Sequence, residues 1–342
     1  MGRGVMSTRT ALAWTCAGLL ALAGAGAAWA QPTQQPGRAA LAVENDDGGY
    51  RATKKYADVR DRVVKARMLE RLRDFLSPIR LPRSVGLLAA ECDGGAGAGP
   101  FYLTGDRTIT ICYQFVAAVE KVADTVIAAQ RENPQFFPFP VTRDEFIWGL
   151  LGGVMLHESG HALFDVLDVP MFGREEDAAD QFAILIALKL RPPLAVAAVK
   201  AYAYFWRGMS DPDAMTKDGS LNQDFADEHG TPSQRLFNGL CIAYGRSPEV
   251  FGKFVAAGWL PQQRAKGCAR EYAQLEQAFT RTVLPFIDTA RMAEMENIDW
   301  LAANYGPAQP APAASTAPAS PVPASNSAQG PGGRGDPLSA GR

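Results

Sequence analysis

The pentapeptide His-Glu-Ser-Gly-His at residues 157–161 carries the most specific chemical signal in this sequence. Side chains four residues apart lie on one face of an α-helix, so His157 and His161 can reach the same metal ion. Glu158 stands beside them and can face the open coordination position, where a carboxylate takes a proton from water. This is the HExxH arrangement of zinc peptidases. A chance match would lie on an exposed helix, but the apolar run at residues 146–156 predicts a buried one.

A catalytic zinc site needs a third protein ligand, and the next predicted helix supplies acids. Glu176 and Asp180 are four residues apart and therefore share a face. That face also carries Ala179 and Ala183, which are small enough to let this helix pack closely against the first. We predict that Glu176 is the third ligand and that Asp180 accepts a hydrogen bond from a ligand imidazole. A dication would relieve the repulsion within such a buried carboxylate pair.

Two other acids compete for the role of third ligand. Glu175 directly precedes Glu176, and Asp165 follows the second histidine by four residues. The acidic run could also serve only as negative charge at a helix N-terminus, which the helix dipole favours. That explanation gives no reason for the alanines on the Glu176 face, so Glu176 stays the predicted ligand.

The third and last histidine of the sequence, His229, directly precedes a predicted helix start. Thr231, Pro232 and Gln234 supply an N-cap, an N1 proline and an N3 glutamine. A histidine held there near the zinc could donate to the oxyanion of a tetrahedral intermediate. Arg235, one helical turn in, could do the same or bind a substrate carboxylate. The alternative is a solvent-facing histidine in a loop.

Three stretches of the sequence together resemble a known family. HESGHALFDVLDVPMFGREEDAADQFA, with ECDGG and ITICYQF upstream and DEHGTPSQRLFNGLCIAYG downstream, is similar to a bacterial family of zinc metallopeptidases catalogued as a domain of unknown function. The resemblance covers most of residues 55–300. HExxH followed by a Glu-x-x-x-Asp helix is more distantly similar to gluzincins, in which the Glu is the third ligand. The resemblance implies a zincin-like fold, one zinc ion per chain and a peptide or protein substrate.

Two further functions are compatible with the same residues. A non-catalytic, zinc-stabilised binding or adaptor protein of the cell envelope would need the metal but no general base, and Glu158 is present. Metal-dependent hydrolysis of a non-peptide amide would use the same machinery. The near balance of 34 Lys and Arg against 36 Asp and Glu excludes a strongly basic nucleic-acid binder.

The elements that must position these residues are mostly helical. Only residues 85–90 and 108–113 show the β-branched and aromatic pattern of strands. Thr142 and Glu145 form a capping box that starts a helix through the HExxH motif. The apolar run in that helix is too short to span a bilayer. We therefore predict an α+β fold, predominantly α, with a small N-terminal sheet and a helical C-terminal part. The helices are expected at residues 54–76, 115–131, from 143 to at least 163, from 174 to before Pro192, and onward to about 303.

Both ends of the chain read as segments outside the fold. Residues 1–30 have the pattern of a signal peptide, with cleavage after Ala30, and residues 31–50 read as a polar linker. The catalytic domain is then expected over residues 51–305. Residues 306–342 are rich in Pro and Ala, so we expect a disordered tail, which could bind an envelope partner. We expect a periplasmic or secreted protein without a transmembrane span in the mature chain.

The cysteines agree with export. Outside the signal segment the sequence has Cys92, Cys112, Cys241 and Cys268. An even number in an exported chain indicates disulfides, with three possible connectivities. We favour the two local pairs, because a hairpin could join Cys92 to Cys112 and two later helices carry Cys241 and Cys268. Four reduced, buried thiols are the alternative.

Overall fold

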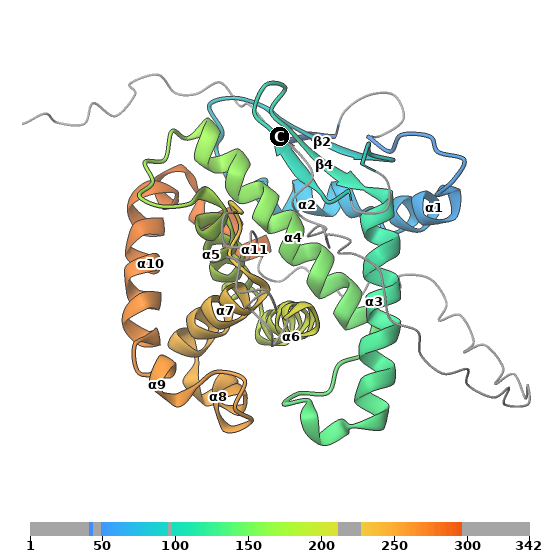
Figure 1. The fold of residues 1–342 in the computed structure, drawn as a ribbon. Coiled ribbons are helices and arrows are strands. Elements are labelled where there is room, and N and C mark those ends of the chain that lie inside the picture. The colour runs from blue at the N-terminus through green and yellow to red at the C-terminus, as the bar shows by residue number, and fades with distance from the viewer. Residues whose placement is uncertain (1–40, 44–48, 95–97, 211–226, 296–342) are drawn as a thin grey trace, which may run out of the picture. The chain divides into compact units, whose positions relative to one another are not determined.

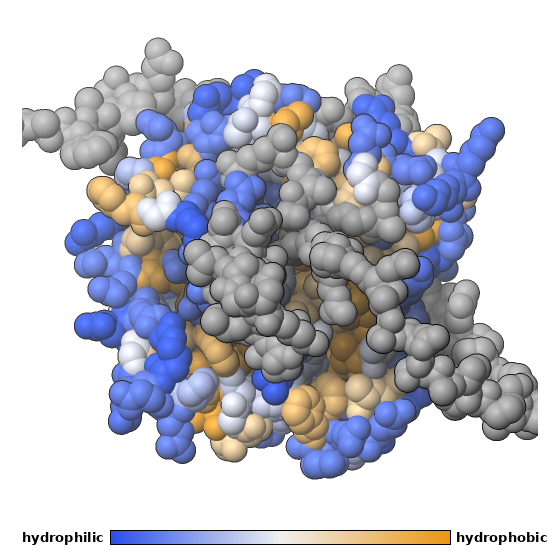
Figure 2. Space-filling view, viewed as in Figure 1, coloured by the Kyte–Doolittle hydropathy of each residue, from blue (hydrophilic) through white to orange (hydrophobic). Residues whose placement is uncertain are grey.

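The computed structural model describes residues 41–43, 49–94, 98–210 and 227–295 of the chain. The predicted signal peptide, its cleavage site, most of the predicted linker and the Pro/Ala-rich tail with its possible partner lie outside these residues. Within them the fold is α+β and predominantly helical, as predicted (Figure 1). On the face shown in Figure 2, hydrophilic residues predominate around the periphery and hydrophobic residues are exposed in small groups.

The sheet has four strands, in the order β1-β2-β4-β3. Strands β1 and β4 run parallel to β2, and β3 runs antiparallel to β4. The two predicted strands, β2 and β4, are confirmed, and every residue of β4 is buried. Strand β1 lies within the segment that the sequence predicts as a polar linker, and it pairs with β2. The bounds are β1 (Leu41–Val43), β2 (Val85–Ala90), β3 (Phe101–Leu103) and β4 (Thr108–Cys112).

The helix predicted over residues 54–76 is two helices, α1 (Ala57–Lys65) and α2 (Met68–Leu76). The chain breaks at Arg67, whose φ of 53° lies in the left-handed region. A helix cannot continue through that conformation, so α2 takes a new direction. It packs on β1 and β2 and buries Leu69 and Leu72 completely or nearly so. Helical periodicity alone does not show such a break, because both halves carry an apolar stripe.

Helix α3 (Tyr113–Glu132) follows β4 directly and leads to the long central helix α4 (Arg143–Val166). The predicted capping box is present: the Thr142 hydroxyl accepts from the Glu145 N–H at 3.2 Å, and the Glu145 carboxylate accepts from the Thr142 N–H at 2.9 Å. Helix α4 contacts α3, α5, α6, β3 and β4, which explains its long apolar run (Figure 1). In the described part of the chain, no helix is both long and apolar enough to cross a membrane.

The C-terminal part is helical, as predicted, and packs around α4 and α5. Within this part, helix α7 starts with the predicted capping box of Thr231 and Gln234. Residues 211–226 and 296–303, which were also expected to continue the helical pattern, lie outside the described residues. The bounds are α5 (Glu175–Ala187), α6 (Pro192–Met209), α7 (Pro232–Arg246), α8 (Pro248–Ala256), α9 (Gln262–Ala265), α10 (Cys268–Thr282) and α11 (Thr289–Met295).

Both favoured disulfides are present, Cys92–Cys112 and Cys241–Cys268. The second joins α7 to the first residue of α10, with Cα atoms 5.0 Å apart. The reason given for the first is wrong, because β2 and β4 pair in parallel and the hairpin is formed by β3 and β4. Cys92 lies just beyond β2, and Ala90 is opposite Cys112 in the register. The bond therefore joins the ends of two parallel neighbours.

Helices α4 and α6 approach each other most closely at a glycine. A Cβ atom at Gly149 would lie 2.8 Å from the Ala197 carbonyl oxygen and 2.9 Å from the Ala201 Cβ. At Gly152, less than one turn further along α4, a Cβ would meet nothing within 4 Å. Both glycines thus lie inside the same helix, but only Gly149 is tightly packed against another element.

We expect Gly149→Ala to lower the free energy of unfolding by about 1–3 kcal/mol, because the added methyl overpacks the α4–α6 contact. Gly152→Ala is the matched control and should raise it by about 0.5–1 kcal/mol through helix propensity. Urea unfolding of the two variants and the wild type measures both. A Gly149→Ala protein as stable as Gly152→Ala would contradict the described packing.

Candidate metal centre

Helix α4 places two imidazoles side by side in the protein interior. The ring centroids of His157 and His161 are 4.8 Å apart, and their Nε2 atoms are 3.2 Å apart. Both side chains are buried. The i, i+4 spacing of the motif therefore produces the shared position that the sequence predicts.

Helix α5 packs against this part of α4 at small residues. A Cβ at Gly160, inside the motif, would lie 3.3 Å from the Ala179 Cα and 3.3 Å from a Phe182 ring carbon. Ala179 itself is fully buried. Because Gly160 and Ala179 carry no bulky side chain where the helices meet, the two backbones come close enough for acids of α5 to reach the imidazoles of α4.

The carboxylate of Glu176 lies where all three histidines of the protein meet. Its Oε2 atom is 3.1 Å from Nε2 of His157, 3.3 Å from Nε2 of His161 and 3.0 Å from Nε2 of His229. One donor atom each from His157, His161 and Glu176 lies within 4.8 Å of the others. This buried group can hold one metal ion.

The second ring nitrogen of each α4 histidine faces another acid of α5. Nδ1 of His157 lies 2.9 Å from Oδ1 of Asp180, and Nδ1 of His161 lies 2.7 Å from Oε1 of Glu175. A carboxylate at Nδ1 fixes the tautomer and turns Nε2 toward the shared position. Glu175, a rival for the third ligand, thus contacts the opposite side of the ring from Glu176.

The other rival ligand lies away from the group. The Asp165 carboxylate accepts a 2.6 Å hydrogen bond from the Tyr102 hydroxyl of β3. Its carbonyl accepts from Arg83 at 2.8 Å. Asp165 therefore links the end of α4 to the sheet and is not among the residues that can share a metal ion.

Arg235 lies behind Asp180. Its guanidinium donates from Nε to Oδ2 and from Nη2 to Oδ1 of Asp180, both at 2.7 Å. The guanidinium carbon stacks 4.0 Å from the centroid of the Trp206 ring. The structure thus forms a chain from Trp206 through Arg235 and Asp180 to His157. The predicted direct action of Arg235 on substrate stays a prediction, whereas its contact with Asp180 was not foreseen.

His229 is not a solvent-facing loop residue, because only 5% of it is exposed. It lies just before α7, and its Nδ1 is 3.0 Å from Oδ1 of Asp227. The same oxygen accepts from the His229 N–H at 2.8 Å, and the His229 carbonyl accepts from Arg174 at 3.1 Å. These contacts hold the ring so that Nε2 faces Glu176. The structure therefore brings all three histidines together around Glu176.

Glu158 is buried with the group and differs from the other acids. It has no hydrogen-bond or ion-pair partner in the described part of the chain, whereas Glu175, Glu176 and Asp180 each face an imidazole. Burial raises its pKa, and the neighbouring imidazoles of His157 and His161 only partly oppose this. Its carboxylate is thus the one acid of the group that is not held by another side chain.

The surrounding acids favour positive charge on the imidazoles. Burial lowers the pKa of His161, but its contacts with Glu175 and Glu176 outweigh burial and raise the pKa to about 10. Burial also lowers the pKa of His157 and of His229, but neighbouring acids outweigh it and raise both values. These acids are Asp180 and Glu176 for His157, and Glu176 for His229. Burial raises the pKa of Glu176, yet the three imidazoles lower it well below its usual range. The acids around the imidazoles therefore stabilise positive charge in this site.

A divalent ion fits this donor set. Two imidazole nitrogens and one carboxylate oxygen are ligands that zinc takes in catalytic sites, where a further position stays open. The acids at the Nδ1 atoms are the partners that ligating histidines have in metalloproteins. A dication would also compensate the negative charge gathered around Glu176.

A comparison with protein families agrees with this geometry. Residues 50–283 match the family model DUF4344, described as "Putative metallopeptidase". The chain belongs to this family. The metallopeptidase match includes α4, α5 and the segment with His229, so it contains the whole candidate metal centre. A search of curated proteins and a search of solved structures give no match.

Sequence reasoning missed three contributors to the centre. Asp227 offered a local signal, because an aspartate often accepts from the N–H two residues on. Glu175 was considered only as a rival metal ligand. Adjacent residues of a helix point in different directions, so Glu175 can contact Nδ1 of His161 while Glu176 faces the Nε2 atoms. Trp206 gave no signal, because its contact with Arg235 joins two helices distant in the sequence.

We expect His157→Ala, His161→Ala and Glu176→Ala each to lose stoichiometric metal, since each removes one of three converging donors. Glu175→Ala should retain one ion at saturation and bind it about 10–100-fold more weakly, because only the partner of a ligand is lost. Elemental analysis and zinc titration measure stoichiometry and affinity. Asp165→Asn, which alters an acid outside the group, is the control. Full metal content in Glu176→Ala together with loss in Glu175→Ala would assign the third ligand to Glu175.

Proposed function

We propose that this protein is an exported zinc-dependent metallopeptidase that hydrolyses peptide bonds with Glu158 as general base. One observation carries the proposal. Glu158 is a buried carboxylate beside a group that can hold a metal ion, and no described side chain holds it. Membership of the family described above supports the same activity. A purely structural metal site would have no use for such an acid.

His157, His161 and Glu176 would hold the ion. Zinc bound there supplies a Lewis acid that polarises the scissile carbonyl and lowers the pKa of water toward about 7. Glu158 would accept the proton of the attacking water and deliver it to the leaving amine. Its place directly after His157 brings it to the group without making it one of the three converging donors.

The remaining polar residues have positioning and stabilising roles in the proposal. Asp180 orients His157 through Nδ1, and Arg235 fixes Asp180 through two hydrogen bonds. His229 would share the oxyanion charge, since its Nε2 lies 3.0 Å from Glu176 and therefore at the rim of the donor group.

Export is the second part of the proposal. Two disulfides are present, and disulfides persist mainly in the periplasm and outside the cell. The sequence of residues 1–30 has the pattern of a cleaved signal peptide. The protein would then meet peptide or protein substrates in the envelope or the medium.

We expect Glu158→Gln to keep its fold and its zinc and to lose about 10²–10⁴-fold in kcat/KM, because an amide cannot accept the proton. Turnover of a broad peptide library by the purified zinc protein, with and without chelator, measures this. Glu132→Gln, which removes an exposed acid at the end of α3, is the matched control and should behave as wild type.

Two outcomes would contradict the catalytic role. Loss of zinc from Glu158→Gln would make Glu158 a ligand or a structural residue. A fully zinc-loaded wild type that cleaves no peptide would favour the non-catalytic binding protein, or the hydrolysis of another amide if such a substrate is turned over.

We expect the exported protein to begin at Gln31 and to contain no free thiol. Intact mass under non-reducing conditions should match residues 31–342 less four hydrogens, one pair for each disulfide. The same sample after reduction should gain those four hydrogens. Retention of Met1 in exported material would refute cleavage, and four thiols titrated after denaturation would refute the disulfides.

A further inference from the structure

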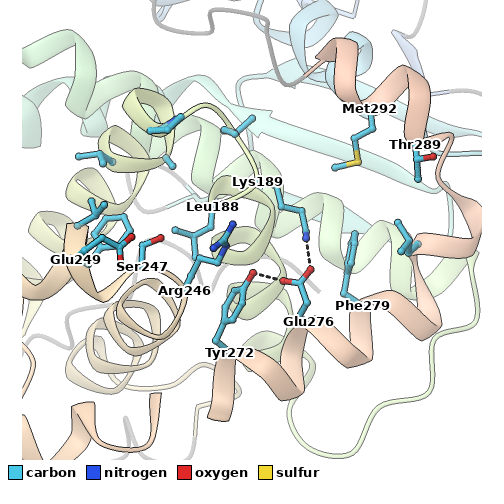
Figure 3. A pocket seen from close by; sticks show the side chains of 17 residues that line it. Leu188, Lys189, Arg246, Ser247, Glu249, Tyr272, Glu276, Phe279, Thr289 and Met292 are labelled. Atoms are coloured by element: carbon cyan, nitrogen blue, oxygen red, sulfur yellow. Dashed lines mark hydrogen bonds and ion pairs between the residues drawn. The ribbon is translucent and has the colours of Figure 1, made fainter. Parts of the chain in front are cut away.

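The two ends of α5 face different surroundings. Just beyond its C-terminal end, Leu188 and Lys189 line a cavity of about 970 Å³, in which Lys189 and Tyr272 both donate to Glu276 (Figure 3). None of the described residues that form the candidate metal centre lines that cavity. At the N-terminal end of α5, by contrast, consecutive side chains contact the histidines or the segment that carries one of them.

His229 reaches the metal centre on a short segment of its own. The other two imidazoles are carried by α4 and Glu176 by α5, whereas residues 227–230 precede α7 and belong to no helix or strand. Asp227, which accepts from the His229 N–H and contacts its Nδ1, belongs to this same segment. That contact fixes the ring relative to its own backbone and leaves open how the segment is fixed relative to α5.

Arg174, the N-cap residue of α5, connects the helix to this segment. Its Nη1 donates to the His229 carbonyl at 3.1 Å. Its Nε and Nη2 lie 3.0 and 2.9 Å from Oδ2 of Asp177, three residues further along the chain. The guanidinium is therefore held on α5 by Asp177 and extends from there to the backbone of the histidine segment.

The residue after His229 also packs against this ion pair. A Cβ at Gly230 would lie 3.4 Å from Oδ1 of Asp177 and 3.5 Å from Cγ of Arg235. Gly230 thus lies between the first turns of α5 and α7. The pair of Arg174 and Asp177 therefore contacts two consecutive residues of the segment, one by a hydrogen bond and one by packing.

The geometry of this contact suits arginine. A planar guanidinium presents several N–H donors in a fixed arrangement, so it can bind Asp177 with two nitrogens and the carbonyl with the third. A lysine ammonium carries the same charge on a single atom and cannot reproduce that arrangement. The side chains of Arg174 and Asp177 are 42% and 30% exposed, and exposed ion pairs contribute little to stability. The contact therefore matters chiefly for position.

We propose that Arg174 positions His229 at the metal centre by holding its segment against the start of α5. Arg174 directly precedes Glu175 and Glu176, so one turn of α5 sets the third ligand, the partner of His161 and the place of His229 together. Arg174 acts through His229 and touches no substrate. The catalytic consequence rests on the proposed function, in which His229 shares the oxyanion charge, whereas the positional consequence does not.

Hydrogen exchange of the full exported chain tests the positional consequence. Arg174→Ala and Arg174→Lys should each speed amide exchange of residues 227–231 by about 2–10-fold, the change expected for loss of one hydrogen bond of ordinary strength. Both variants should keep Tm within about 2 °C of the wild type.

Arg73→Ala is the matched control for this experiment. Arg73 is 38% exposed and likewise donates from Nε and Nη2 to one oxygen of a nearby acid, Asp74, but it lies on α2 and contacts no residue of the metal centre. It should leave exchange of residues 227–231 unchanged. Exchange at the wild-type rate in both Arg174 variants would overturn the proposal.

Kinetics of the same variants test the catalytic consequence. Arg174→Ala should lower kcat and leave KM unchanged, by no more than the roughly 10²–10³-fold that loss of an oxyanion donor costs. In a His229→Ala background the same change should cause no further loss, because Arg174 then has no imidazole to position.

Two kinetic results would overturn the role of Arg174. An equal loss in both backgrounds would mean that Arg174 does not act through His229. An Arg174→Lys protein as active as the wild type would mean that charge alone suffices. A wild type that cleaves no peptide would contradict the proposed function instead, and the exchange comparison would then decide by itself whether Arg174 holds the segment.

Discussion

All three histidines of the protein converge on one buried carboxylate, and the packing of the surrounding helices must hold them there. Glu176 lies within 3.3 Å of Nε2 of His157, His161 and His229. Burying a carboxylate costs free energy unless charged or hydrogen-bonding groups compensate it. Here α4, α5 and the segment before α7 must therefore be held in place so that the imidazoles, or a bound cation, can do so. The close approach of α4 and α5 at Gly160 and Ala179 meets that demand.

The helices around this centre act mainly as its support. Helix α4 carries three of the proposed functional residues and is fixed on one side by α6 at Gly149 and on the other by the sheet. Helix α7 supplies Arg235, which pairs with Asp180 and so connects the fold of the C-terminal part to the orientation of His157. The Cys241–Cys268 disulfide attaches α7 to α10. The contacts that stabilise the helical part therefore also position the side chains of the site.

Local sequence signals predicted the parts of this site that depend on local geometry. The HExxH spacing, the capping boxes at Thr142 and Thr231, and the shared face of Glu176 and Asp180 follow from helical periodicity and cap chemistry. The break at Arg67, the strand β1 and the stacking of Arg235 on Trp206 did not follow. Those features arise from tertiary packing, which overrides propensity and leaves no mark in a short window of sequence.

X-ray absorption at the zinc edge of the wild-type protein, loaded with one equivalent of zinc, tests the central claim most directly. The account predicts a shell of nitrogen and oxygen only, at about 2.0–2.2 Å, with the outer scattering of two imidazoles. Two imidazoles correspond to His157 and His161, with Glu176 as the third protein ligand. A shell with three imidazoles would show that His229 replaces Glu176, and a shell without imidazole would show that zinc binds elsewhere and would contradict the account.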